Sequence, residues 1–216
     1  MHPGWLSNAY LIGDEPGGTG VFVDSGAPLE PLYEAAERHA LSITHLLTTH
    51  ADADHVAGDD EIVGRYGCPV VKGDLDTGGL SIRALETPGH KDDHLAFVVN
   101  DQLCCSGDVL FKDAVGGGDF DEIRNSVMDV LMKLPHETRV LPGHTDDTTI
   151  GREWEQNPFV RVWRGAEPEG SERVRVGGEE TTLVVWSPDY DGKGKAWIRF
   201  DDGRDAIVGG SRVERG

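Results

Sequence analysis

One short segment of the chain, TTHADADHVAG at residues 48–58, contains four side chains that could bind a metal ion. They are His50, Asp52, Asp54 and His55, and alanines separate the first three of them. Imidazole and carboxylate groups in combination suit zinc, iron or manganese. The segment therefore predicts a metal-binding loop, and it raises the question of how the carboxylate of Asp52 changes the chemistry.

Three further candidate ligands each follow an apolar segment that has the character of a β-strand. His90 ends LETPGH, Asp108 ends LCCSGD and His144 ends RVLPGH. The carboxyl ends of successive strands lie on one edge of a sheet, so residues far apart in the sequence converge there. We therefore expect these three side chains to lie beside the loop and to complete a site for divalent metal.

The other side chains with metal-binding chemistry lack this context. His39 lies near the end of a predicted helix, His45 within a strand, His136 after a proline turn and His2 at the start of the chain. A histidine needs no metal to satisfy its ring nitrogens, so we expect these four to be surface or structural residues. The vicinal pair in QLCCSGD is sterically poor for a disulfide, and we expect it to be buried in a strand of a protein from a reducing compartment.

The composition limits the range of partners. The chain has 216 residues, 38% of them hydrophobic, which favours one globular domain with at most a small appendage. Its formal net charge of −19 repels nucleic acids and anionic membrane surfaces. The sequence shows no apolar run long enough for a membrane span and no signal peptide. We expect a cytoplasmic protein that acts on a small molecule, with neither nucleic acid nor membrane as a partner.

Strands and helices alternate along the first three quarters of the chain. Strand-like segments are NAYLIGD, GVFVDSG, ITHLLTTH, CPVVKG, LSIRALETPGH, HLAFVVND, QLCCSGDVLF and TRVLPGH. Helical spacing occurs in LEPLYEAAERHA, HVAGDDEIVGRYG and DFDEIRNSVMDVLMKLP, and a last helix in IGREWEQNPFV should stop before Pro158. Asn100 and Asp101 predict a hairpin turn.

The composition shifts after Arg164, where RGAEPEGSERVRVGGEE is charged and poor in large apolar residues. We expect residues 1–164 to form the metal-binding catalytic domain, 165–180 a linker and 181–216 a small β-rich unit. The unit's strands carry Trp186 and Trp197, which we expect to be packing anchors. About 35 residues are too few for an independent core, so the unit should pack on the main domain or on a second subunit.

The order of the ligand-bearing pieces resembles the metallo-β-lactamase superfamily. HADADH, TPGH, SGD and LPGH occur in the order of that family's motifs, which are HxHxDH, a TPGH-type turn, a GD pair and a PGH turn. The resemblance extends over residues 8–159, includes VDSG and NPF, and points to the small glyoxalase II-like hydrolases. It implies an α/β fold, an αββα sandwich of two mixed sheets with outer helices, to which this chain adds a small C-terminal β-unit.

The resemblance also implies a role for each candidate residue. The ligands of the first metal would be His50 and His90, those of the second Asp54, His55 and His144, and the bridge between the metals Asp108. Two residues would support the ligands from outside, Asp24 of VDSG and His94 of GHKDDHLAF. The glycines of TPGH and LPGH would permit sharp turns that aim the histidines.

Asp52 departs from the family because it occupies the place of the second loop histidine. It would either bind the first metal or stand beside it as a base. As a ligand it would favour manganese or iron over zinc, relative to a histidine, because it adds a hard oxygen. We expect it to coordinate, since a free carboxylate beside Asp54 would suffer like-charge repulsion.

The activity implied by the resemblance is metal-dependent hydrolysis. Two divalent cations, expected to be zinc with iron or manganese as alternatives, would hold a hydroxide that attacks a thioester, ester or lactone carbonyl. Asp54 would receive or orient a proton as the catalytic acid–base. The sequence offers no G-x-S-x-G element for a serine nucleophile.

Other functions stay open on the sequence alone. Phosphodiesters are disfavoured as substrates by the acidic charge. A non-haem iron oxidoreductase, of the persulfide dioxygenase type with His50, His90 and Asp108 as a triad or of the diiron type, would use the same fold. A metal-free scaffold with the C-terminal unit as the binding module is a third candidate. The family's usual first strand has no counterpart before NAYLI, so an exposed sheet edge would favour a homodimer.

Overall fold

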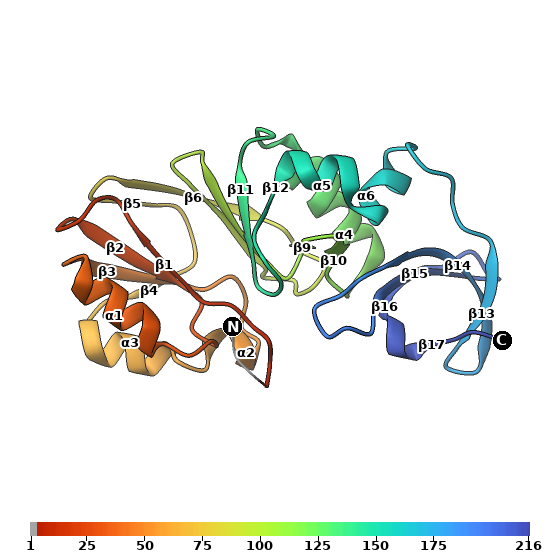
Figure 1. Cartoon of the computed structure of the whole chain (residues 1–216), viewed down its shortest axis with the longest axis horizontal. Coiled ribbons are helices and arrows are strands. Elements are labelled where there is room, and N and C mark those ends of the chain that lie inside the picture. Colours follow the sequence, from red (N-terminus) through yellow and green to blue (C-terminus); the bar gives the residue numbers. More distant parts are fainter. Residues whose placement is uncertain (1–3) are drawn as a thin grey trace.

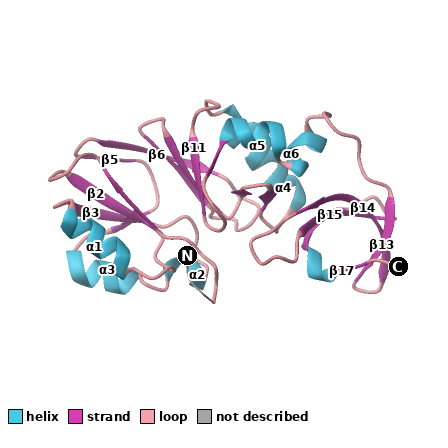
Figure 2. Ribbon diagram, in the orientation of Figure 1, coloured by secondary structure: helices cyan, strands magenta, loops and turns pink. Residues whose placement is uncertain are grey.

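The computed structural model describes residues 4–216, so His2 lies outside the described residues. Two sheets form the centre of the main part of the molecule, with helices on their outer faces, and a third, antiparallel sheet lies at the C-terminal end (Figures 1 and 2). The metal-binding candidates lie where the two central sheets meet at the carboxyl ends of their strands.

The first sheet has four strands in the order β1-β2-β3-β4. Its strands are β1 Tyr10–Gly13, β2 Thr19–Val23, β3 Ser42–Leu47 and β4 Val70–Val71. Its helices are α1 Glu30–Arg38, α2 Ala53–Val56 and α3 Asp59–Tyr66. β1 and β2 are antiparallel, whereas β2, β3 and β4 are parallel. Among the described strands β1 pairs only with β2, so it is an edge strand, as the sequence predicted.

The second sheet has six strands in the order β12-β11-β8-β7-β6-β5. Its strands are β5 Leu75–Thr77, β6 Leu80–Glu86, β7 Leu95–Val99, β8 Leu103–Gly107, β11 Arg139–Pro142 and β12 Thr148–Thr149. A small hairpin joins β9 Leu110–Phe111 to β10 Ala114–Val115. The predicted turn between β7 and β8 is confirmed, because Asn100 and Asp101 have φ of 50° and 54°, as a two-residue hairpin turn requires.

Both faces of the central strands are buried, which explains why their sequences are almost continuously apolar. Successive side chains of a strand point to opposite faces. In β2, Val21 and Val23 pack between the two sheets, while Phe22 packs under α1 and α3. In β8, Cys105 packs between the sheets and Cys104 faces the helices on the far side. The cysteines are therefore free core residues, as expected.

The helices on the far side of the second sheet differ in part from the prediction. They are α4 Phe120–Asn125, a π-helical turn η1 Ser126–Val130, a 3₁₀ turn η2 Leu131–Lys133, α5 Ile150–Gln156 and α6 Pro158–Trp163. α5 ends before Pro158 as predicted, but the chain does not stop being helical there. Asn157 caps a new helix by accepting from the backbone N–H of Phe159, and Pro158 occupies its first turn, where proline is tolerated.

The C-terminal sheet is antiparallel in the order β16-β15-β14-β13-β17. Its elements are β13 Glu172–Val176, β14 Glu179–Ser187, β15 Lys195–Phe200, β16 Asp205–Gly209, η3 Gly210–Arg212 and β17 Val213–Glu214. The structure places β13 inside residues 165–180, which the sequence predicts to be a linker. Only Val174 and Val176 of that strand are buried, so its charged composition concealed it.

The C-terminal sheet packs against the helices of the second sheet. Trp197 is buried and its ring lies 4.9 Å from that of Phe120 and 6.2 Å from that of Trp163. Trp197 is thus the packing anchor that the sequence predicts. Trp186 is not, because it is 39% exposed under the guanidinium of Arg215. No helix among the described residues is long and apolar enough to span a membrane.

Candidate metal centre

The loop that follows β3 carries four of the candidate ligands into the centre of the molecule. His50 and His55 are fully buried, whereas Asp52 and Asp54 are partly exposed. Asp52 precedes α2 in an extended conformation, but its side chain does not cap the helix. Its carboxylate is therefore free to face the histidines that the other strands contribute.

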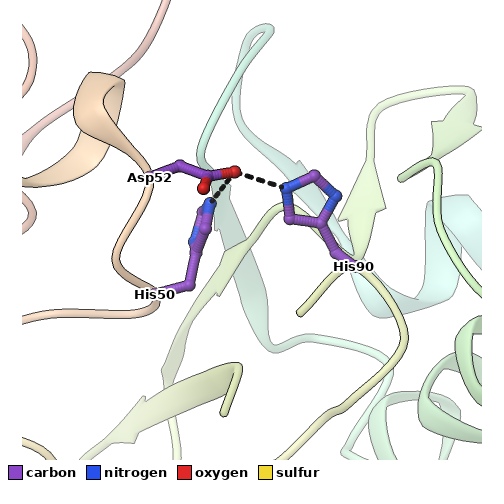
Figure 3. A group of neighbouring side chains, drawn as sticks. All are labelled: His50, Asp52 and His90. Carbon is purple, nitrogen blue, oxygen red and sulfur yellow. Dashed lines mark ion pairs between the residues drawn. The ribbon is translucent and has the colours of Figure 1, made fainter. Parts of the chain in front are cut away.

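A first cluster consists of His50, Asp52 and His90 (Figure 3). Asp52 Oδ2 lies 3.4 Å from His90 Nε2 and 3.8 Å from His50 Nε2. These separations are too long for good hydrogen bonds. Two ligands bonded at about 2.1 Å to one tetrahedral zinc lie about 3.4 Å apart, so the separations suit atoms that share a cation.

A second cluster consists of Asp54, His55 and His144. Asp54 Oδ2 lies 3.5 Å from His144 Nε2 and 3.9 Å from His55 Nε2. The residues come from α2 and from the turn after β11, which are distant in the sequence. This cluster again offers two imidazole nitrogens and one carboxylate oxygen at separations that a single cation would produce.

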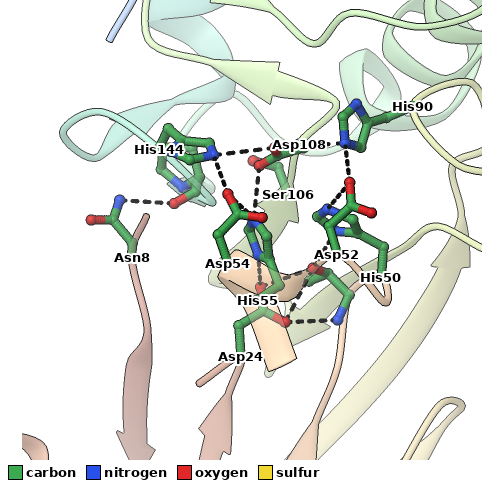
Figure 4. Close-up of polar contacts among 12 residues, drawn as sticks. Asn8, Asp24, His50, Asp52, Asp54, His55, His90, Ser106, Asp108 and His144 are labelled. Atoms are coloured by element: carbon green, nitrogen blue, oxygen red, sulfur yellow. Dashed lines mark hydrogen bonds and ion pairs between the residues drawn. The ribbon is translucent and has the colours of Figure 1, made fainter. Parts of the chain in front are cut away.

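Asp108 lies between the two clusters (Figure 4). Its Oδ1 is 3.4 Å from His55 Nε2, and its Oδ2 is 3.3 Å from His144 Nε2 and 3.8 Å from His90 Nε2. The carboxylate thus faces histidines of both clusters. The structure brings together all seven residues that the sequence singled out as ligands, and a bridging carboxylate is the role that the position of Asp108 allows.

Unpaired buried atoms suit this centre to binding a cation. His50 Nε2, His55 Nε2 and Asp108 Oδ1 are all buried without a hydrogen-bond partner. Buried polar atoms are nearly always paired, because an unpaired one costs free energy. These three converge in one cluster, within 4.8 Å of one another. The residues present therefore fit a divalent metal, and the clusters could hold one.

The second nitrogen of each imidazole is held by a neighbour. The partners of the four Nδ1 atoms are Thr49 Oγ1 for His50 at 3.0 Å, Asp24 for His55 at 2.8 Å, Gly117 O for His90 at 2.8 Å and Leu6 O for His144 at 2.9 Å. A carbonyl oxygen only accepts, so His90 and His144 donate through Nδ1 and, when neutral, keep a lone pair on Nε2. All four rings therefore direct Nε2 toward the centre, as ligands do.

Asp24 is the hub of this outer layer. It is buried and accepts from the backbone N–H of Thr49 at 2.8 Å and from its hydroxyl, as well as contacting His55. The φ of Asp24 is 56°. Two residues later, a Cβ on Gly26 would lie 1.7 Å from the carbonyl oxygen of Asp54, so only glycine fits there. The VDSG turn therefore holds the carboxylate of Asp24 in contact with the ligand loop.

His94 has both ring nitrogens engaged away from the clusters. Its Nδ1 lies 2.8 Å from Thr87 Oγ1, and its Nε2 accepts from the backbone N–H of Asp108 at 3.0 Å. Burial lowers the pKa of His94 to about 3, so the ring is neutral and able to accept. His94 thus contacts the backbone of Asp108 and not a ligand atom, and its role in supporting the ligands stays a prediction.

Gly89 and Gly143, which precede His90 and His144, are each required for a different reason. Gly89 has φ of 127°, which a residue with a side chain rarely adopts. Gly143 has no such conformation. A Cβ there would lie 2.1 Å from Asp108 Oδ1 and 2.7 Å from His55 Cε1. The expected sharp turn therefore holds at Gly89, whereas Gly143 is needed to leave room for the centre itself.

The charges of the cluster are strongly coupled. Burial, and next the neighbouring His55, lower the pKa of His50 to about 2. Burial also acts to lower the pKa of His55, but the nearby carboxylates of Asp108 and Asp24 outweigh it and raise that pKa to about 10. Burial opposes ionisation of Asp108, yet His144 and His55 hold its pKa well below the usual range. The carboxylate of Asp108 therefore favours a proton on His55, and a cation at this centre would have to displace that proton.

Two further residues at this centre, Lys91 and Tyr190, are not predicted from the sequence. Lys91 Nζ lies 2.8 Å from Asp52 Oδ1, while Oδ2 of the same carboxylate faces His50 and His90. The signal was available, because a lysine directly follows His90. Tyr190 stacks on His144, but it lies in a turn of the C-terminal unit, and nothing in its sequence context indicates this.

Lys91 changes the charge at the first cluster. Asp52 in place of a histidine adds one negative charge, and the ammonium of Lys91 adds one positive charge beside it. The pair is therefore neutral, like the imidazole it stands in for. The side chain of Lys91 is 44% exposed, so solvent screens part of this compensation.

Comparison with known proteins identifies the family. The sequence model of the Metallo-beta-lactamase superfamily matches residues 2–78. An uncharacterised protein of Aquifex aeolicus is 30% identical, and the match covers 71% of this chain and 91% of that relative. The chain belongs to the metallo-beta-lactamase superfamily.

Two of the relatives have named activities. The Bacillus subtilis protein YqgX, named a probable metallo-hydrolase, is 27% identical, with 71% of this chain and 92% of that protein covered. A hydroxyacylglutathione hydrolase of Rhodopseudomonas palustris is 35% identical, but only 62% of this chain and 61% of that enzyme are covered. Both of these relatives are named as hydrolases.

Solved structures of the superfamily share the fold. The B3 metallo-beta-lactamase BLEG-1 is 25% identical with a TM-score of 0.66, covering 71% of this chain and 94% of its own. ETHE1 from Myxococcus xanthus is 27% identical with a TM-score of 0.62, covering 75% and 87%. A protein solved in a di-iron-bound form is 29% identical with a TM-score of 0.62, covering 74% and 98%. The predicted fold class is confirmed.

Proposed function

We propose that this protein is a metal-dependent hydrolase of thioesters or of related esters and lactones. The observation that carries the proposal is Asp108, whose two oxygens face histidines of two separate three-residue clusters. The two clusters would hold two divalent cations, which would supply a hydroxide at neutral pH and polarise a carbonyl group. The named hydrolases among the relatives support this chemistry. We take zinc as the first metal to test.

The side chains of the chain have distinct tasks in this proposal. His50, Asp52 and His90 would hold one cation, and Asp54, His55 and His144 the other, with Asp108 between them. Asp54 is the candidate acid–base, because its carboxylate is 28% exposed at the rim and can exchange a proton with bound substrate. Asp24 and His94 would keep the ligands in place.

A second candidate function is non-haem iron chemistry. His50, Asp52 and His90 form a set of two histidines and one carboxylate, which is typical of non-haem iron(II) oxygenases. Asp52 lies 3.4 Å and Asp108 3.8 Å from His90 Nε2, so either carboxylate could complete a triad with His50 and His90. The similarity to ETHE1 and to the di-iron-bound protein is compatible with this alternative.

Metal analysis combined with activity assays separates the two functions. Protein purified without oxygen should contain two equivalents of divalent metal and hydrolyse a thioester, a p-nitrophenyl ester or a lactone without consuming oxygen. Iron together with oxygen uptake on a persulfide would refute hydrolysis and support the alternative. Metal-free protein with no activity in either assay would refute both.

The variant His144→Ala tests the ligand set, with His39→Ala as its control. His39 is an exposed residue at the end of α1. His144→Ala should fold but lose one metal equivalent and at least about 100-fold in turnover. Mutation of a residue that only supports a ligand already costs about 10- to 100-fold in metal affinity or activity. His55→Ala should do the same. Full metal content and full turnover in either variant would show that the assignment of ligands is wrong.

A further inference from the structure

The loop between β14 and β15 carries an aromatic ring from the C-terminal unit to the metal centre. The ring of Tyr190 stacks on that of His144, with centroids 4.0 Å apart and planes only 10° from parallel. Phe111 contacts both rings edge-on, at 5.8 Å from His144 and 5.9 Å from Tyr190. Figure 1 shows this loop extending from the C-terminal sheet toward β9 and β10.

The position of Tyr190 is fixed by the loop around it. Asp189 forms an ion pair with Lys195 at 2.9 Å, and both side chains are at least nine-tenths buried. Breaking a buried ion pair on one side is strongly unfavourable, so this contact anchors the loop. Asp189 also accepts from the backbone N–H of Tyr190 through its side chain and from that of Gly192 through its carbonyl.

Two glycines with positive φ form the C-terminal part of the loop. Gly194 has φ of 84°, and a Cβ there would lie 2.5 Å from the ring of Trp186. Gly192 also has a positive φ, of 73°. The loop is thus a compact turn whose one aromatic side chain, Tyr190, lies against His144.

The contact of Tyr190 has a consequence for the centre. The hydrogen bond from His144 Nδ1 to Leu6 O fixes the position of that nitrogen. The imidazole ring can still tilt about this bond. Parallel stacking restrains this tilt, and aromatic pairs of this kind contribute beyond their buried area. Tyr190 is only half-buried, so part of its side chain faces solvent next to His144. The ring therefore also forms a wall beside the second cluster.

We infer that Tyr190 is a positioning and specificity-determining residue, so that the C-terminal β-unit forms part of the active site. The ring holds His144 for metal binding and limits the size of the acyl group on the side of the second cluster. The part about acyl size rests on the proposed hydrolase function, whereas the part about His144 requires only that the cluster binds metal. BLEG-1, ETHE1 and the di-iron-bound protein cover 71–75% of this chain, and similarity to them does not assign a role to Tyr190.

The first test measures metal retention and needs no substrate. Zinc-loaded parent, Tyr190→Ala, Tyr190→Phe and Phe200→Ala proteins are mixed with a chromophoric chelator, and the rate of zinc release is recorded. Phe200 is a control because it is an aromatic residue of the same unit that packs within the C-terminal sheet. Tyr190→Ala should release one equivalent about 2- to 12-fold faster, the effect of one aromatic pair. Tyr190→Phe keeps the stacked ring and should behave as the parent.

The second test measures the kcat/KM ratio for a bulky and a short acyl thioester. Tyr190→Ala should raise this ratio, whereas Tyr190→Phe and Phe200→Ala should leave it unchanged. Parental zinc release together with a parental ratio in Tyr190→Ala would overturn the inference. Equal effects of Tyr190→Ala and Phe200→Ala would also overturn it, since they would show a general loss of stability. If the parent hydrolyses no acyl substrate, the proposed function fails, and zinc release alone decides the role of Tyr190.

Discussion

Asp24→Asn tests whether the outer layer of the centre controls metal binding. The substitution keeps the shape of the side chain but removes its charge and replaces one oxygen by an NH₂ group. Asp24 Oδ1 accepts from the backbone N–H of Thr49, and an amide oxygen can still do so. The NH₂ group would then face His55 Nδ1, which lies 2.8 Å from Oδ2. A ring that binds metal through Nε2 carries its proton on Nδ1, so two donors would meet.

The size of the effect follows from that contact. Both partners are buried, and a hydrogen bond to a charged group contributes about 1.5–3 kcal/mol. A factor of ten in affinity corresponds to about 1.4 kcal/mol. The expected loss of metal affinity is therefore about 10- to 100-fold, which agrees with the usual effect of removing a residue that supports a metal ligand.

A chelator competition assay measures this loss, with Asp14→Asn as the control. Asp14 likewise holds a turn through its carboxylate, by accepting the backbone N–H groups of Glu15, Thr19 and Gly79, but no hydrogen bond or ion pair joins it to the clustered histidines. Both variants should lower the melting temperature, and only Asp24→Asn should weaken metal binding. Metal affinity within twofold of the parent in a folded Asp24→Asn protein would refute the reasoning.

Three further predictions concern the first cluster, pH and the C-terminal unit. Asp52→His should raise the zinc content relative to manganese in elemental analysis and shift the acidic limb of the hydrolytic pH profile to lower pH, because an imidazole replaces a hard, negatively charged oxygen. Unchanged metal content and profile would show that Asp52 is not a ligand. Metal affinity should rise from pH 7 towards pH 10, because His55 holds a proton up to a pKa of about 10 and must lose it to bind metal. Calorimetry in two buffers should detect the released proton, and a flat pH dependence would contradict this. Truncation after Arg164 should lower the melting temperature in a thermal scan, because it exposes the surface that Trp197 covers, and an unchanged value would contradict it.

Some elements are predictable from local sequence and others are not. The strands that carry ligands have long apolar runs, and the Asn100–Asp101 turn has residues that tolerate positive φ. By contrast, β13 has alternating charged residues because one of its faces is exposed, which makes it resemble a linker. α6 was missed because a proline after a helix usually indicates an end, whereas here it begins a new helix.

The sequence by itself determined which side chains could bind metal, because the spacing of His50 to His55 and the strand-end positions of His90, Asp108 and His144 are local properties. Tertiary structure decided how these groups face one another. Only folding brings Lys91 against Asp52 and aims the backbone N–H of Asp108 at His94. It also places Tyr190, 46 residues after His144, on the face of that ring. The physical reason is that such contacts depend on the packing of separate sheets and loops, and no periodicity or spacing along the chain encodes that packing.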